Sequence, residues 1–237
     1  MIMVPPFNAR GVPMPIRIGV ALAITLLLVP TLTYYPTPIQ EITALGIAVM
    51  RELVIGLGMG FVVSIVFNAI YVAGQLIDVP MGFGMVSVLD PNIGIQVPIV
   101  AQFLNIFATL MFFAIGGPRI VILVLGKSFQ LVPLGPGPVS SAIASVGLEA
   151  FIKMFLIGVT LSLPAVAALL LTDIALGILA RVVPQINVFI VGFPLKIGVG
   201  LLILALGMPV YIWALAGLFA SDGVIWTYVE RFLRSFL

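Results

Sequence analysis

The sequence contains no cysteine and no histidine. Their absence excludes disulfide bonds, thiolate nucleophiles, imidazole bases and the usual zinc ligands. Charge is also scarce, because only 8% of the 237 residues are Asp, Glu, Lys or Arg and the formal net charge is +2. So weak a basic balance gives no electrostatic footprint for nucleic acid. We therefore expect no cofactor, no bound metal and no nucleic-acid partner.

The sequence also lacks the short motifs of common enzymes. It contains no HExxH zinc motif, no GxSxG nucleophile turn and no phosphate-binding loop. Its acidic residues Glu41, Glu52, Asp78, Asp90 and Glu149 lie in separate segments. A catalytic carboxylate pair would therefore arise only if folding happened to bring two of them together. We predict that the chain is not an enzyme.

What the sequence does contain is apolar residues, which make up 62% of the chain, with a mean hydropathy of +1.35. A water-soluble core does not need this composition, whereas each membrane-spanning helix takes about 20 apolar residues. The composition predicts an all-α polytopic membrane protein built from helical hairpins that Pro and Gly bend.

Proline and glycine divide the apolar residues into segments. A proline inside a helix removes a hydrogen-bond donor and clashes with the preceding turn. We expect Pro164 to bend one long helix, Pro194 and Pro209 to break the next, and the glycine-rich connection 80–94 to be irregular. The expected helical segments are residues 16–33, 43–78, 97–115, 120–132, 147–182 and 185–219, followed by an amphipathic tail from residue 221.

The organising stretch is residues 89–119, which starts at a turn signal, Asp90-Pro91-Asn92, and ends at Gly116-Gly117-Pro118. A helix that meets Gly-Gly-Pro cannot continue regularly. The pattern predicts a bulky, flexible apolar tip at a helix end, and the alternative interpretation is an ordinary bend between two membrane helices. The tip residues are Leu110, Met111, Phe112, Phe113, Ile115, Gly116 and Gly117.

Ionisable residues inside apolar helices are costly and usually have partners or functions. The candidates are Glu52, Lys153, Asp173 and Lys196. Asp173 lies eleven residues before Pro184 and Lys196 twelve residues after it, so a hairpin that turns at Pro184 places both about 17 Å from its tip. We predict that Asp173 and Lys196 form a buried charge pair. The pair would serve to neutralise both charges, to relay protons or ions, or to contact a partner subunit.

Three blocks together resemble the FliR family, the flagellar branch of the SpaR/YscT/FliR proteins of type III secretion export gates. The most specific block is the last hairpin, in which LLTDIALG at 170–177 is followed by RVVPQINVF at 181–189 and GFPLK at 192–196. The second block runs from Met81-Gly82-Phe83 to Leu89-Asp90-Pro91, and the third is the Phe112-Phe113 run that ends at Gly116-Gly117. Each block alone is a weak pattern, but the three occur in the family's order.

The resemblance implies a division into a FliP-like helical part with the tip at 1–132, a Pro/Gly/Ser loop at 133–146, a FliQ-like hairpin at 147–220 and an amphipathic tail at 221–237. It also implies a core subunit of the flagellar export gate, which forms the protein-conducting channel with FliP and FliQ and docks FlhB. Exported flagellar proteins would pass as transient substrates, membrane lipid would be a further partner, and the multi-pass protein would belong to the bacterial inner membrane and the flagellar basal body. The hairpin turn would bind partners through Arg181, Pro184, Gln185 and Asn187.

In a gate of this kind the tip would act as a plug, because bulky apolar side chains seal a conduit by dewetting and contact. Gly116 and Gly117 would let the seal move. One departure from the family is the start of the chain, where residues 1–4 would be the remnant of an additional N-terminal helix, so a misassigned start or a truncation is expected. The alternatives are an injectisome export gate and a free-standing secondary transporter, whose helices are also broken and carry midplane charges.

Overall fold

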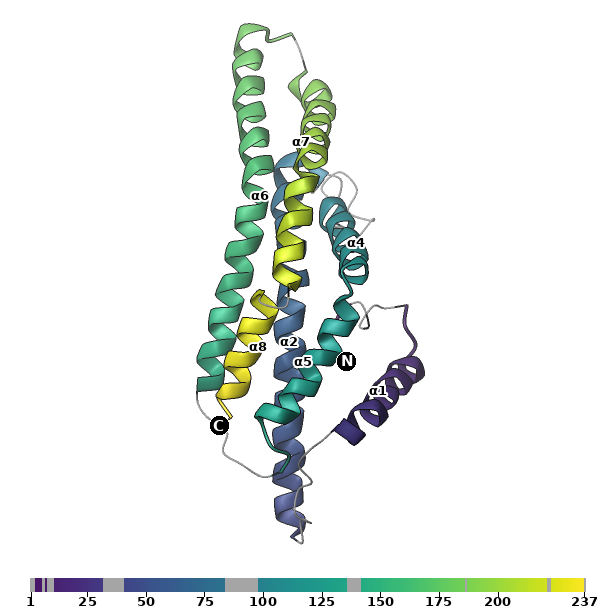
Figure 1. Ribbon diagram of the computed structural model, residues 1–237. Helices are drawn as coiled ribbons and strands as arrows, with labels where there is room; N and C mark the ends of the chain where they lie inside the picture. The colour runs from purple at the N-terminus through teal and green to yellow at the C-terminus, as the bar shows by residue number, and fades with distance from the viewer. Residues whose placement is uncertain are drawn as a thin grey trace. The chain divides into compact units, whose positions relative to one another are not determined.

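The structure is a computed structural model that describes residues 3–5, 7, 11–31, 41–83, 98–135, 142–185, 187–220 and 223–236. Within these ranges all regular secondary structure is helical and there is no strand, which confirms the all-α class (Figure 1). The helices are α1 (Met14–Leu28), the 3-10 helix η1 (Val29–Thr31), α2 (Ile42–Met81), α4 (Ile99–Ala114), α5 (Gly117–Leu131), α6 (Ala142–Val182), α7 (Val188–Phe219) and α8 (Val224–Arg234).

Three helical segments in the described part of the chain are long and apolar enough to cross a membrane. They lie in α2, in α6 and in the segment that contains α7. The pair α4 and α5 would add a fourth span if the two helices, which are bent by 70° at the break between them, count as one. These lengths agree with a polytopic helical membrane protein, because a straight span of about 30 Å needs about 20 residues.

The first helix is shorter than the span predicted at residues 16–33. The α-helix α1 ends at Leu28, and the chain continues as the short 3-10 helix η1, which contains Pro30. Val29, which precedes Pro30, still has α-helical backbone angles, with φ of −48° and ψ of −46°, and the chain tightens into 3-10 geometry from Val29 to Thr31. With 15 residues, or about 22 Å, α1 is too short to cross a bilayer as a straight helix.

The prediction that Pro194 and Pro209 break the last long helix is wrong, since α7 is continuous through both. Pro164 lies inside the continuous helix α6, and the bend predicted there stays a prediction. Each proline costs a helix one backbone hydrogen bond. In an apolar segment, unwinding would expose more backbone groups with no water to bind them, so keeping the helix is favoured.

The described chain divides into two compact units, and each takes pieces of several helices. Unit 1 consists of residues Met1–Phe67, Thr109–Lys153 and Ala216–Leu237, whereas unit 2 consists of Asn68–Ala108 and Met154–Leu215. The division predicted at the 133–146 loop cuts the chain once along its sequence, whereas these units are defined by contacts between segments. The predicted division stays a prediction.

The C-terminal helix α8 packs against the rest of unit 1 through one apolar face. Ile225, Val229, Phe232 and Leu233 form its buried face. The ring of Phe232 lies so close to Gly58 on α2 that a Cβ at Gly58 would overlap it. The amphipathic tail predicted from residue 221 is thus a helix whose apolar side is covered by its own chain.

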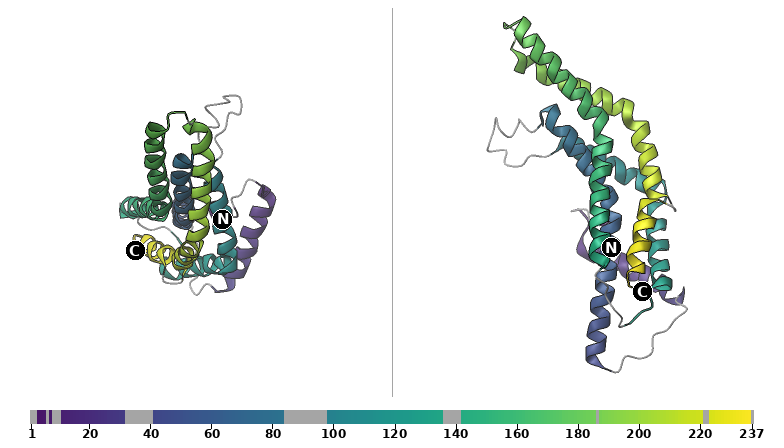
Figure 2. Two further views of the ribbon diagram at one scale, coloured as in Figure 1. Left: turned by 90° about the horizontal axis from the view of Figure 1, so that it is seen from above. Right: turned by 90° about the vertical axis from the view of Figure 1, so that its left-hand side faces the viewer.

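Unit 2 contains residues 154–215 of the α6–α7 hairpin, which turns between Val182 and Val188 (Figures 1 and 2). Tyr211 on α7 donates a hydrogen bond to the carbonyl of Leu161 on α6 at 3.0 Å. Nearer the turn, Gly192 of α7 lies against Leu176 of α6. Contacts at both levels show that the two arms run antiparallel along each other, as the sequence predicted.

Candidate functional site

The break between α4 and α5 is made by glycine. Ile115 and Gly116 separate the two helices, and Gly116 has φ of +81°, a left-handed conformation that costs glycine little and other residues more. Gly117 and Pro118 then start α5, where the missing proline N–H is not needed by the helix. The Gly-Gly-Pro signal therefore bends the chain where the sequence placed the break.

Phe112 anchors this bend inside unit 1. Its side chain is 1% exposed, and its ring makes edge-to-face contacts with Phe67 and Phe219, with ring centroids 5.4 and 5.3 Å apart. Phe67 and Phe219 also contact each other, with centroids 5.4 Å apart. Gly117 fits because it has no side chain, since a Cβ there would overlap the Phe112 ring. The buried ring and the glycine thus hold the turn together.

The residues predicted to form a plug therefore divide into two groups. Leu110 and Phe113 are 63% and 51% exposed. Phe112 and Gly117 are buried, whereas Met111, Ile115 and Gly116 are half-buried. Leu110 and Phe113 expose the most apolar surface to a conduit or to a partner, whereas Phe112 and Gly117 hold the bend.

The Asp173 carboxylate and the Lys196 ammonium form a salt bridge between the two arms of the hairpin. Their side chains are 39% and 23% exposed, so neither charge is fully buried. The pair lines a pocket of about 300 Å³ in unit 2. The remaining lining residues are small or apolar and include three glycines: Gly82, Gly177, Gly192, Leu176, Val188 and Phe193.

The residues predicted to bind partners at the hairpin turn are exposed. They are Arg181, Pro184, Gln185 and Asn187. Asn187 also has a local role as the cap of α7. Its backbone carbonyl accepts hydrogen bonds from the N–H groups of Ile190 and Val191, and its side-chain oxygen accepts a longer one from Ile190 at 3.4 Å. An Asn at this position satisfies helix N–H groups that have no partner within the helix.

Sequence reasoning missed Asp78, which holds the start of α4. Asp78 is 5% exposed, and its two carboxylate oxygens accept hydrogen bonds from the N–H groups of Val100 and Ala101 at 2.9 and 3.1 Å. Both N–H groups lie in the first turn of α4, where no carbonyl of the helix itself can accept them. A lone carboxylate near the end of an apolar helix was the only signal in the sequence.

We expect Asp78→Ala to lower the stability of the protein by about 2 kcal/mol, since it removes a cap and leaves two buried donors without an acceptor. Thermal unfolding of the detergent-solubilised protein measures this. The control is Glu230→Ala, which removes a carboxylate that pairs with Arg234 on the surface of α8. If both variants unfold at the same temperature, Asp78 does not stabilise α4.

Arg51 is the second residue that sequence reasoning missed. It is 6% exposed, and its guanidinium donates hydrogen bonds to the carbonyls of Pro133, Gly135 and Phe236 at 3.1, 3.0 and 3.2 Å. The guanidinium also lies 5.9 Å from the centre of the Phe236 ring. Arg51 thereby ties the residues after α5 and after α8 to α2 within unit 1.

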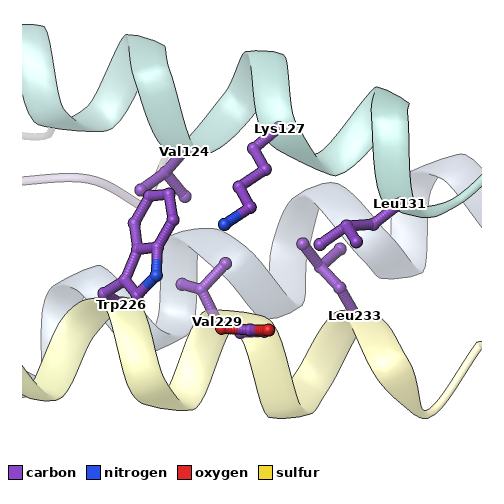
Figure 3. A pocket seen from close by; sticks show the side chains of 7 residues that line it. Val124, Lys127, Leu131, Trp226, Val229 and Leu233 are labelled. Carbon is purple, nitrogen blue, oxygen red and sulfur yellow. The ribbon is translucent and has the colours of Figure 1, made fainter. Parts of the chain in front are cut away.

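A small pocket lies between α5 and α8 (Figure 3). The Lys127 ammonium from α5 points to the ring of Trp226 on α8 and lies 4.1 Å from its centre, a cation–π contact. The pocket has a volume of about 10 Å³, room for a single water molecule. Among the described residues no group of three or more Asp or Glu side chains could hold a metal ion.

Comparison with known proteins gives consistent results. Residues 1–221 match the family described as bacterial export proteins, family 1. The chain is 36% identical over 209 residues to the flagellar biosynthetic protein FliR of Pectobacterium carotovorum subsp. carotovorum, covering 86% of this chain and 78% of the relative. It is 35% identical to FliR of Bacillus subtilis (strain 168), covering 88% and 82%. It is 33% identical to the surface presentation of antigens protein SpaR of Salmonella typhimurium, covering 67% and 59%.

Proposed function

This chain belongs to family 1 of the bacterial export proteins, and on that premise we propose that it is a core subunit of the flagellar type III export gate. The observation that carries the proposal is the family match over residues 1–221, together with relatives named as flagellar biosynthetic proteins. In the proposed gate the chain forms the protein-conducting channel with FliP and FliQ in the bacterial inner membrane, and FlhB docks on the assembly.

The exposed apolar surface of the long helices supports a role as one subunit of a larger assembly. Both arms of the hairpin expose large apolar residues, among them Leu171 and Ile178 of α6 and Leu202 and Leu206 of α7, each more than half exposed. Such surface must meet lipid or neighbouring helices. The pocket at Asp173 and Lys196 adds a polar site on the same hairpin, which an adjoining subunit could fill.

The gate itself is assigned to the exposed part of the bend. We assign the seal to Leu110 and Phe113, whereas buried Phe112 and Gly117 hold the bend that presents them. Apolar side chains at a constriction exclude water and ions without forming a covalent barrier. A passing polypeptide can displace Leu110 and Phe113 while Phe112 keeps its contacts with Phe67 and Phe219.

The test of this assignment is the conductance of the assembled complex in membranes. We expect the double variant Leu110→Ala with Phe113→Ala to assemble with FliP and FliQ and to conduct ions in the closed state at least tenfold more than the wild type. The matched control is Phe103→Ala with Ile106→Ala, two side chains three residues apart on the same helix that are 50% and 52% exposed.

Equal, low conductance in the wild type and both variants would mean that the tip is an ordinary helix bend. Failure of the wild-type chain to co-isolate with FliP and FliQ would instead overturn its assignment as a gate subunit. A free-standing transporter, the remaining alternative, would be isolated as a stable protein without either partner.

The relationship to SpaR supports a second candidate, the equivalent subunit of an injectisome. The two functions are separated by complementation. A flagellar subunit should restore motility to a strain that lacks FliR, whereas an injectisome subunit should restore secretion to a strain that lacks SpaR.

A further inference from the structure

Lys153 is a cation without a partner on an apolar helix. It is exposed on α6, and from Ala150 to Thr172 no other residue of the sequence is charged. Among the described residues Lys153 makes no salt bridge, hydrogen bond or cation–π contact. The other two lysines are engaged within the chain, Lys127 by the ring of Trp226 and Lys196 by Asp173. Lys153 therefore has an uncompensated charge.

The surface around Lys153 is apolar. Ile152 and Leu156 are 49% and 54% exposed; they lie four positions apart on one face of α6, and Leu156 lies three positions after Lys153. The acid one turn earlier, Glu149, does not compensate the lysine, because its carboxylate pairs with Arg231 of α8 at 3.3 Å. Helix α6 thus presents an unpaired ammonium beside exposed apolar side chains, one turn from the exposed Glu149–Arg231 pair.

We propose that this face of α6, defined by Ile152, Lys153 and Leu156, docks against an apolar helix of a partner subunit that presents a carboxylate to Lys153. The inference rests on the proposed function as a subunit of an assembly, and it adds the chemistry of one contact. An apolar partner helix covers Ile152 and Leu156, while its Asp or Glu neutralises the ammonium in a site that excludes water. A charge-assisted hydrogen bond of this kind also sets the register between the two helices.

Lys153 does not lie at an end of α6, and we assign its partner to a helix rather than to a lipid headgroup. Lysines that reach the membrane surface lie near helix ends. Lys153 lies eleven residues after the start of α6 at Ala142, about 16 Å along the helix, and the large apolar residues Phe155 and Leu156 follow it. A carboxylate on an adjoining helix meets the ammonium at its own depth.

Carbodiimide cross-linking tests the contact, since it joins a carboxylate to a lysine amine only when the two touch. The reagent activates the carboxylate, the amine displaces the resulting urea, and an amide bond remains. We expect an apolar carbodiimide to link the wild-type chain to a partner subunit in the intact complex with FliP and FliQ. Sequencing of the linked peptide should place the bond at Lys153.

Lys153→Arg is the matched control, because arginine keeps the positive charge but does not form this amide. It should co-isolate with its partners as the wild type does and lose the cross-link. Lys153→Glu should reduce co-isolation at least fivefold, because it places a second carboxylate at the contact. Lys153→Met keeps the length of the side chain without its charge. Its co-isolation with the partners should lie between that of Lys153→Arg and that of Lys153→Glu.

An intact wild-type complex that gives no cross-link at Lys153 would overturn the inference and leave the proposed function standing. Co-isolation of Lys153→Glu at the wild-type level would overturn it as well. A wild-type chain that does not co-isolate with FliP and FliQ is a different result, because it overturns the proposed function itself.

Discussion

Gly74→Ala should destabilise the protein more than any other replacement of a glycine by alanine in α2. A Cβ at Gly74 would overlap the Cα of Ala101 on α4 and would lie 2.6 Å from its backbone nitrogen. The obstacle is backbone and not the end of a flexible side chain, so the two helices must move apart. The same movement would pull Asp78 away from the N–H groups of Val100 and Ala101.

We expect a loss of about 3 kcal/mol or more, the upper end of the usual cost of overpacking. The control is Gly46→Ala on the same helix, where nothing lies within 4 Å of the added Cβ. This control should leave stability unchanged or raise it by up to about 1 kcal/mol, because alanine is the better helix former. The temperature of unfolding of the detergent-solubilised protein compares the two variants. Similar values would show that α2 and α4 do not approach closely at Gly74.

Phe112→Ala should give the second large effect, because it empties the centre of the ring cluster in unit 1. Replacing a buried phenylalanine by alanine usually costs about 3–5 kcal/mol. We expect the lower end of this range, about 3 kcal/mol, because lipid around the unfolded helices already keeps the ring out of water. What remains is the loss of packing against Phe67, Phe219 and Gly117.

The matched control is the neighbouring variant Phe113→Ala. Phe113 is 51% exposed, and its one aromatic contact is with Phe112, so its removal should cost less than about 1 kcal/mol. The two variants should therefore affect different properties, one the stability of the protein and the other the gate. Phe112→Ala should unfold at a lower temperature and assemble poorly, whereas Phe113→Ala should assemble normally and change the gate. Equal unfolding temperatures for the two variants would contradict the role of Phe112 as the anchor of the bend.

The sequence alone determined the features that depend on neighbouring residues or on a fixed helical rise. Segments of more than 30 mostly apolar residues required helices, and Gly116-Gly117-Pro118 required a break between α4 and α5. The spacing of Asp173 and Lys196 about Pro184 placed both charges at one depth of the hairpin, because an α-helix rises by about 1.5 Å per residue. Their salt bridge follows once the two arms lie side by side.

The tertiary structure alone decided which residues of those helices are buried, because burial depends on contacts far apart in the sequence. Arg51 bonds to residues 82, 84 and 185 positions away, and no local pattern contains such partners. Phe112 and Phe113 are adjacent and chemically identical, yet one is enclosed by rings from α2 and α7 and the other is half exposed. Nor does the local sequence decide that α7 continues through Pro194 and Pro209. Each proline destabilises the helix, but unwinding the helix in an apolar surrounding would cost more, because its backbone groups would lose their hydrogen bonds.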